Sequence, residues 1–241
     1  MDPRQTLARL FSDRPLRPRP APQEVLTHDE QGRLRERKFL LNDRIEGEYA
    51  SYYRSGQAMV LLHFEKGQRN GEGASWYPDG RLREKGFFRN DRLDGEYLSY
   101  YETGQLHERE FYRNGLLDGT YTLYFRNGQI RDEEHFRNGK FDGPYRCWYK
   151  NGQLREEGRF LNDRREGEYR AYDREGRLRE RALYRDGRLI GPFETFAADG
   201  SLVTTQPGEV PSWTETDKEA GETRKKEADD LLKNLPTVDR S

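Results

Sequence analysis

Hydrophobic and polar residues recur along this chain with a fixed period of 24 residues. A glycine marks each period without any insertion between copies, at Gly32, Gly56, Gly80, Gly104, Gly128, Gly152, Gly176 and Gly200. A second glycine follows each of the first seven after 15 residues, as Gly95 follows Gly80. Because a fixed period changes the meaning of every residue that recurs with it, positions are counted from the first glycine of each repeat, which is position 0.

The period divides into two short stretches that are typical of strands. An aliphatic residue at position 2 opens a run of charged residues that ends, in most copies, on an aromatic residue at position 8. Turn pairs such as Asn90-Asp91 and Asn114-Gly115 follow, and such pairs tolerate the positive φ of a tight hairpin. The second stretch reads Gly-Glu-Tyr-x-x-Tyr-Tyr in its most regular form. Each period therefore predicts one β-hairpin.

These hairpins predict an all-β fold. Glycine recurs too often for helix interiors, and no stretch inside the repeat keeps a period of 3.6 residues. Strands lie about 4.8 Å apart in a sheet, so each repeat should advance the sheet by about 10 Å. We therefore expect an elongated open repeat ribbon of seven tandem antiparallel β-hairpins, with a short helix near the C-terminus as an addition.

Aromatic residues occupy three positions of the second strand. Position 17 is Tyr or Phe except at Gly73, and position 21 is aromatic in five repeats. Position 20 is aromatic in every repeat, as Tyr52, Trp76, Tyr100, Tyr124, Trp148, Tyr172 and Phe196. Side chains alternate between the two faces of a strand, so positions 17, 19 and 21 should share one face and position 20 the other. The position-20 row either packs within the ribbon or faces a protein partner, because Tyr and Trp are enriched in interfaces.

The second repeat departs from the pattern. Met59, Val60, Leu61 and Leu62 replace charged residues, and Gly73 replaces the tyrosine of position 17. Four consecutive apolar residues in a strand place hydrophobic groups on both faces. Two explanations stay open: an N-terminal arm folds back over the extra apolar face, or the patch binds a partner or a second copy of the chain.

Composition excludes several classes of function. Charged residues make up 36% of the chain and hydrophobic residues only 32%, which suits stacked repeats that share a thin core. The 43 basic and 44 acidic residues nearly cancel, so we expect no nucleic-acid binding and at most weak binding to membrane lipid. Basic residues at position 3 beside acidic residues at position 4 predict a solvated face with cross-strand ion pairs, or a recognition stripe. The N-terminal sequence lacks an apolar h-region and the chain has one cysteine, so we expect a cytoplasmic protein.

Reactive side chains are scattered along the repeats. His63 and His135 share a position but lie three repeats apart, about 29 Å along the expected ribbon. The sequence contains no zinc motif, nucleophile elbow or phosphate-binding loop. Cys147 stands at a position that otherwise holds small residues, so a packed thiol is expected. The prediction is a protein that is not an enzyme and has no catalytic residues, cofactor or metal.

The two ends differ in charge from the repeats. Residues 1–23 form an Arg/Pro-rich arm with five arginines and two aspartates, and the tail over 204–241 has six basic and nine acidic residues. The tail contains a helix-compatible stretch over 217–235, which either caps the last strand or binds a partner. The expected repeat domain, 24–203, has these parts: a half-repeat cap over 24–31, seven repeats over 32–199 and the start of a terminal strand over 200–203.

The repeat resembles the MORN repeats, and more closely the bacterial MORN-variant repeat. The shared pattern is G-x-L, an aromatic residue before x-N-G, and (D/E)-G-x-Y-x-x-Y-Y-x-x-G, and it covers residues 32 to about 203. Members of that family are often labelled antitoxins of toxin–antitoxin pairs or occur as immunity-like neighbours of toxins. Other MORN proteins are reported as scaffolds or lipid-associated modules.

The resemblance implies a protein-binding module. The first expectation is an antitoxin or immunity-like protein that binds and occludes a toxin or another neighbouring gene product. The alternative is a structural scaffold or membrane-surface protein, and self-association stays open. The candidate partner-binding residues are the position-20 row and the apolar run: Tyr52, Trp76, Tyr100, Tyr124, Trp148, Tyr172, Met59, Val60, Leu61 and Leu62.

Overall fold

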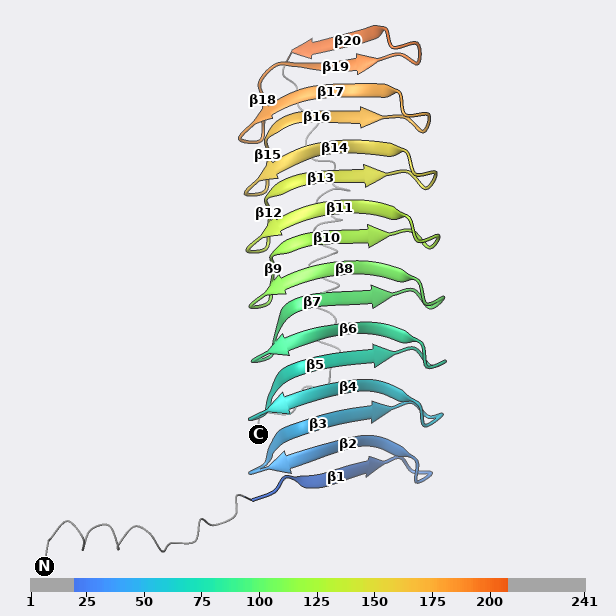
Figure 1. Ribbon diagram of the computed structural model, residues 1–241, viewed down its shortest axis with the longest axis vertical. Helices are drawn as coiled ribbons and strands as arrows, with labels where there is room; N and C mark the ends of the chain where they lie inside the picture. The colour runs from blue at the N-terminus through green and yellow to red at the C-terminus, as the bar shows by residue number, and fades with distance from the viewer. Residues whose placement is uncertain (1–19, 208–241) are drawn as a thin grey trace, which may run out of the picture.

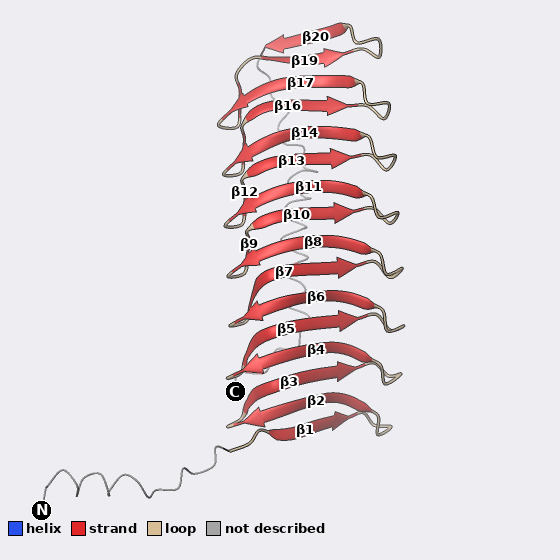
Figure 2. Ribbon diagram, viewed as in Figure 1, coloured by secondary structure: helices blue, strands red, loops and turns tan. Residues whose placement is uncertain are grey.

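The chain folds into one long antiparallel sheet. The computed structural model describes residues 20–207, and all regular structure in this range is strand (Figures 1 and 2). Within this range no helix is long and apolar enough to cross a membrane. The helix expected over 217–235 and most of the N-terminal arm lie outside the described residues. The predicted all-β ribbon of hairpins is confirmed.

The strands follow one another along the sheet in chain order. Their bounds are β1 (Gln23–His28), β2 (Leu34–Leu41), β3 (Arg44–Tyr52), β4 (Ala58–Glu65), β5 (Gln68–Trp76), β6 (Leu82–Arg89), β7 (Arg92–Tyr100), β8 (Leu106–Arg113), β9 (Leu116–Leu117), β10 (Gly119–Tyr124), β11 (Ile130–Arg137), β12 (Lys140–Phe141), β13 (Gly143–Trp148), β14 (Leu154–Leu161), β15 (Arg164–Arg165), β16 (Gly167–Tyr172), β17 (Leu178–Arg185), β18 (Arg188–Leu189), β19 (Pro192–Phe196) and β20 (Leu202–Pro207). Each long strand between the two ends pairs with the long strand before it and the long strand after it. Each two-residue strand pairs only with the long strand before it, as β9 does with β8. The first and last strands do not pair with each other, so the ribbon is open (Figure 1).

The hairpin turns have the backbone that their residues favour. Asn90 and Asp91 both have positive φ, 50° and 66°, between β6 and β7. Asn114 and Gly115 do the same between β8 and β9, with φ of 51° and 82°. Two consecutive residues with positive φ are typical of the type I′ turn, whose twist matches that of the flanking strands. The turns predicted from the Asn-Asp and Asn-Gly pairs are therefore confirmed.

Two irregularities recur in the ladder. In the later repeats the second strand is split at position 14, where for example the Asp118 N–H donates to the Phe111 carbonyl at 2.8 Å. A register shift also separates positions 19 and 20, so that Ser99 pairs with Glu108 but Tyr100 pairs with Leu106. The residue at position 3, His107, is the extra residue of this bulge. Both bulges bend the sheet locally without breaking its continuity.

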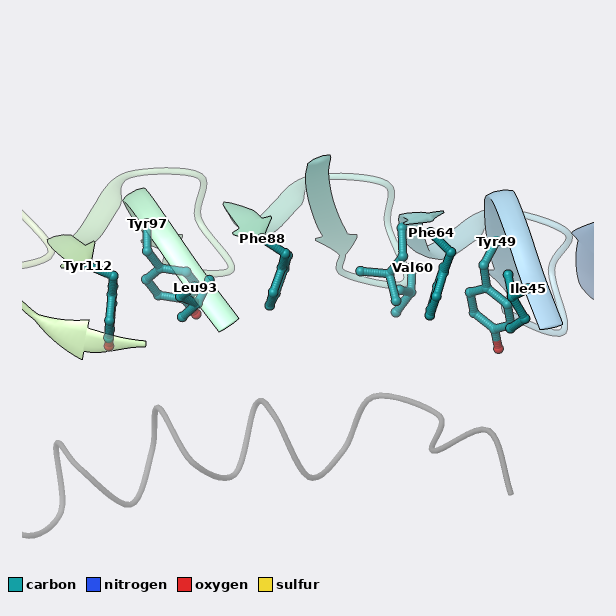
Figure 3. Packing of buried hydrophobic residues seen from close by; sticks show 9 residues of the cluster. Ile45, Tyr49, Val60, Phe64, Phe88, Leu93, Tyr97 and Tyr112 are labelled. Atoms are coloured by element: carbon teal, nitrogen blue, oxygen red, sulfur yellow. The ribbon is translucent and has the colours of Figure 1, made fainter. Parts of the chain in front are cut away.

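The core lies along one face of the sheet, which we call the core face. It carries positions 4, 6, 8, 13, 17 and 19, and Figure 3 shows its side chains projecting from one side of the ribbon. Edge-to-face ring pairs join position 17 of one repeat to position 8 of the next: Tyr49–Phe64, Tyr97–Tyr112, Tyr121–Phe136 and Tyr169–Tyr184, with centroids 6.2 to 6.4 Å apart. These contacts link each hairpin to its neighbour, as expected for a repeat protein.

The tyrosines of position 21 differ from the prediction. The second strands end at position 20, so position 21 lies in the turn and does not continue the alternation of the strand. Its hydroxyl donates to the backbone carbonyl of position 20 in the next repeat: Tyr53 to Trp76 at 2.7 Å, Tyr77 to Tyr100 at 2.7 Å, Tyr101 to Tyr124 at 2.6 Å and Tyr149 to Tyr172 at 2.9 Å. These tyrosines therefore tie successive repeats together at the turns.

Replacing Tyr101 with phenylalanine should lower the free energy of unfolding by about 1 kcal/mol, because a partly buried carbonyl loses its hydrogen bond. Phe125 occupies the same position one repeat later and has no hydroxyl. Replacing Phe125 with tyrosine should therefore be neutral or stabilising. Urea unfolding of both variants measures the difference, and a Tyr101→Phe protein as stable as the parent would contradict this role.

Candidate binding surfaces

The apolar run of the second repeat divides between the two faces of the sheet. Val60 and Leu62 are buried in the core cluster, and half-buried Met59 packs against it. Leu61 points to the opposite face, where it pairs with Ala50 and Ala74 on the neighbouring strands. Val60 and Leu62 therefore pack in the core. They do not form the exposed binding patch that was one of the two explanations for the apolar run. The other open explanation, an N-terminal arm folded over this region, concerns residues 1–19, which lie outside the described residues.

Leu62 fills the space that Gly73 leaves. The two residues lie directly opposite each other on β4 and β5. A Cβ atom added at Gly73 would lie 2.8 Å from Leu62 Cδ2 and 2.8 Å from Phe88 Cε2, which is closer than real Cβ atoms approach. In the next repeat the sizes are reversed, because Gly86 lies opposite Tyr97. The two substitutions in the second repeat thus compensate each other and explain why Leu62 stands in its apolar run.

The position-20 row lies on the other face, which we call the outer face and which also carries positions 5, 7, 16 and 18. Every member of the row is half-buried. Each pairs with the position-2 residue of the next strand, as Tyr100 does with Leu106 and Trp148 with Leu154. Tyr172 Oη also donates to Glu157 Oε1 at 3.1 Å. The row therefore packs against aliphatic residues and still presents part of each ring to solvent.

Basic and acidic side chains form ion pairs around this row. Arg109 Nε lies 2.7 Å from Glu96 Oε1, and Arg181 Nε lies 2.6 Å from Glu194 Oε2. These pairs cross between neighbouring strands on the outer face. Exposed pairs contribute little to stability, typically 0 to about 1 kcal/mol. Their effect is to give the outer face a mixed and nearly balanced charge.

The acidic series of position 4 lies on the core face, where its glutamates are half-buried, and the predicted solvated face was wrong for Asp132. Asp132 is only 2% exposed. Several ion pairs of this series join sequence neighbours, such as Arg83 Nε–Glu84 Oε1 at 3.3 Å, because the bulge lets the side chain at position 3 reach the face of position 4. Burial raises the pKa of the Glu84 carboxyl, while Arg83 and a hydrogen bond from Ser75 Oγ act in the opposite direction.

Two further carboxylates, at position 6, were not singled out from the sequence. Glu110 and Glu134 are buried on the core face, at a position where three other repeats have glycine or alanine. Tyr112 Oη donates to Glu110 Oε2 at 2.7 Å. The signal was present in the sequence, since an acidic residue at a position that alternation assigns to the core requires a polar partner. The middle of the core face is thus more acidic than its two ends.

Cys147 is buried on the core face of β13. Cys147 lies directly opposite Asp132 of the neighbouring strand β11. Burial raises the pKa of the Cys147 thiol, and the negative charge of Asp132 raises it further. Only the thiolate is a good nucleophile, so the environment makes this thiol inert.

We expect Cys147 to react with iodoacetamide at least about 100-fold more slowly in the native protein than in urea, because both thiolate formation and access are lost on folding. Mass spectrometry of timed samples gives the two rates. A native rate close to that of the unfolded chain would contradict the burial of this side chain.

The histidines do not gather in one place. His63 Nδ1 lies 3.1 Å from the Glu72 carbonyl and His135 Nδ1 lies 2.9 Å from the Pro144 carbonyl, so each ring nitrogen donates to the backbone of a neighbouring strand. Across residues 20–207 no group of three or more His, Cys, Asp or Glu side chains is placed to hold a metal ion.

The repeat pattern is matched by a known family. Residues 69–90, 93–114, 117–138 and 141–162 each match the MORN repeat variant. The chain carries MORN-variant repeats. Each matched segment spans a second strand and the first strand of the next repeat, as β5 and β6 do, and this hairpin is called a MORN unit below. The chain is therefore a repeat protein of a kind that generally serves binding.

Other comparisons add little. None of the curated proteins matches the sequence. A crystal structure of TcdB2–TccC3 is 11% identical and covers 76% of this chain and 14% of its own chain, with a TM-score of 0.16. A protein of unknown function from Bacteroides fragilis is 12% identical and covers 69% of this chain and 94% of its own, with a TM-score of 0.12. This chain therefore spans a small part of the first structure, and neither likeness bears on function.

Proposed function

We propose that the chain is a non-enzymatic protein-binding module that holds its partner on the outer face of the ribbon. The observation that carries this proposal is the position-20 row, in which every ring is half-buried and none is covered completely. Strands about 4.8 Å apart place successive rings about 10 Å apart along the ribbon. Such a row suits a partner with an extended contact surface.

The row is held rigidly before any partner arrives. Each ring packs beside an aliphatic residue such as Leu106 or Leu154, and the carbonyls of Trp76, Tyr100 and Tyr124 accept hydrogen bonds from the position-21 tyrosines. Rings fixed in this way lose little conformational entropy on binding. Tyr and Trp are also the residues most enriched among interface hot spots.

The charge of the outer face favours a folded protein as the partner. Ion pairs such as Arg109–Glu96 place both signs beside the row, which gives no continuous positive track for a polyanion. We further propose that the partner is a toxin encoded beside this chain, and that the chain acts as an antitoxin or immunity-like protein in the cytoplasm. This step rests on the resemblance to MORN-variant proteins.

Co-expression with the product of the neighbouring gene tests the function. We expect a stable complex and protection of the host cell from that product. The absence of both would refute the antitoxin role. Binding to acidic vesicles that persists after removal of residues 1–19 would instead favour a membrane-surface scaffold.

The surface is tested separately with a Tyr100→Ala, Tyr124→Ala double variant. Loss of two hot-spot rings should weaken the complex by at least about 100-fold, since each ring contributes roughly 1.4 kcal/mol or more. Arg89→Ala is the matched control, because this exposed residue lies in β6 near the hairpin turn, away from the row. Thermal melts establish that both proteins are folded, and unchanged affinity of the double variant would refute the outer face as the binding surface.

A further inference from the structure

The two terminal strands of the described ribbon each have one unpaired edge. Among residues 20–207, β1 pairs with β2 alone and β20 pairs with β19 alone. They lie at opposite ends of the ribbon (Figure 1). A free strand edge presents unpaired N–H and C=O groups that can pair with another strand.

The two edges have complementary places in the repeat. β1 is a second strand, since it pairs with β2 as β3 pairs with β4, and β20 is a first strand, since it pairs with β19 as β17 pairs with β16. The ribbon thus begins and ends at boundaries of the MORN unit. Inside the ribbon, β6 and β7 pair across a junction between two MORN units. The free edge of β20 corresponds to the edge of β6 at that junction, and the free edge of β1 corresponds to the edge of β7.

We infer that β20 of one copy pairs with β1 of another copy, so that the sheet continues head to tail in the register of the internal unit junctions. At such a junction Glu84 pairs with Ser99, Lys85 with Leu98 and Gly86 with Tyr97. The corresponding pairs between two copies are Thr204 with Thr27, Thr205 with Leu26, and Gln206 with Val25.

The composition of β20 supports this pairing. Its sequence, LVTTQP, has no charged residue. All seven internal strands at the same place in the repeat carry charged residues. Natural proteins usually protect a free edge with charge. Threonine opposite threonine is itself a favourable cross-strand pair, and Pro207, which has no N–H, sets the end of the new ladder at Gln206.

Exposed apolar side chains lie on both terminal strands. Leu26 of β1 is 47% exposed, and Leu202 and Val203 of β20 are 53% and 62% exposed. A junction of three residue pairs is small compared with standard protein interfaces, so the contact should be weak and dependent on concentration. The contact joins two different edges, which generates open chains of copies.

Disulfide trapping tests the register. In the full chain carrying Thr27→Cys and Thr204→Cys, the two new cysteines belong to opposite ends of one ribbon and meet only between copies. Directly opposite strand residues have Cα atoms about 4.5–5.5 Å apart, within the range that a disulfide accepts. Mild oxidation should give a ladder of covalent multimers that grows with protein concentration. Cys147 is buried and stays in place.

The control variant carries Leu26→Cys with Thr204→Cys. Residue 26 faces the opposite side of the strand from residue 27, so its cross-linking should be at least about 10-fold weaker. An equimolar mixture of the two single variants, Thr27→Cys and Thr204→Cys, should stop at a mixed dimer. Three results would each overturn the proposal. The two double variants could give equal yields, or links could form only between like edges. Links could also be absent, as they would be if residues 1–22 or 208–241 cover an edge.

Discussion

Replacing Gly73 with tyrosine should lower the free energy of unfolding by about 3 kcal/mol, and adding Leu62→Gly to that variant should recover most of the loss. The Cβ of the new side chain would lie 2.8 Å from Leu62 Cδ2 and 2.8 Å from Phe88 Cε2, so the strands must separate or both side chains must leave their rotamers. Leu62→Gly alone should cost about 3–5 kcal/mol, because it removes a buried side chain and leaves a cavity. The double variant restores the arrangement that Gly86 and Tyr97 have one repeat later.

Equilibrium unfolding of the two single variants and the double variant gives the coupling energy between positions 62 and 73. We expect at least about 2 kcal/mol of favourable coupling, which is large for neighbouring residues. The reverse exchange, Gly86→Leu with Tyr97→Gly, provides the matched control in a regular repeat and should behave in the same way. Additive losses in both repeats would show that the two positions do not share one packing site.

Replacing Gly143 with alanine should destabilise the protein by about 3 kcal/mol, whereas Gly167→Ala should cost only about 1 kcal/mol. Both glycines stand at position 15 with positive φ, 145° at Gly143 and 80° at Gly167. A Cβ at Gly143 would lie 2.6 Å from His135 Cβ, and a Cβ at Gly167 would meet no atom within 4 Å. Alanine is strained at both positions, and the first variant adds a steric clash to that strain.

The same unfolding measurement compares the two glycine variants directly. Because they occupy the same position in two repeats, a difference between them reports the close contact of Gly143 together with its larger φ, and not the general cost of alanine at positive φ. Equal losses at Gly143 and Gly167 would mean that β11 and β13 can move apart at this point without penalty.

The fold was predictable because its signals are local and repeated. Turn pairs such as Asn90-Asp91 require positive φ, and they fixed the hairpin turns before any contact was known. Alternation along the strand correctly separated position 17 from position 20. The compensation between Leu62 and Gly73 was also readable, since a large apolar residue occupies position 6 only where position 17 is glycine.

Other features depend on distances between repeats and could not be read from the pattern. The hydroxyl of Tyr101 reaches the Tyr124 carbonyl because the turn places position 21 against the next repeat. The bulge at position 3 determines that the acidic residues of position 4 lie on the core face. Asp132 is buried for this reason. How far the position-20 rings are exposed depends on the same bulge, because it pairs each ring with an aliphatic residue.

The extensive contacts join strands that are adjacent in the ladder, so each hairpin depends mainly on its neighbours. Deletion of residues 104–127 removes one whole period and joins position 23 of one repeat to position 0 of another. Small-angle X-ray scattering of this variant, combined with its unfolding curve, tests the open ribbon most directly. We predict a cooperatively folded protein whose longest dimension is shorter by about 10 Å. A chain that fails to fold, or that folds with an unchanged longest dimension, would contradict the ribbon.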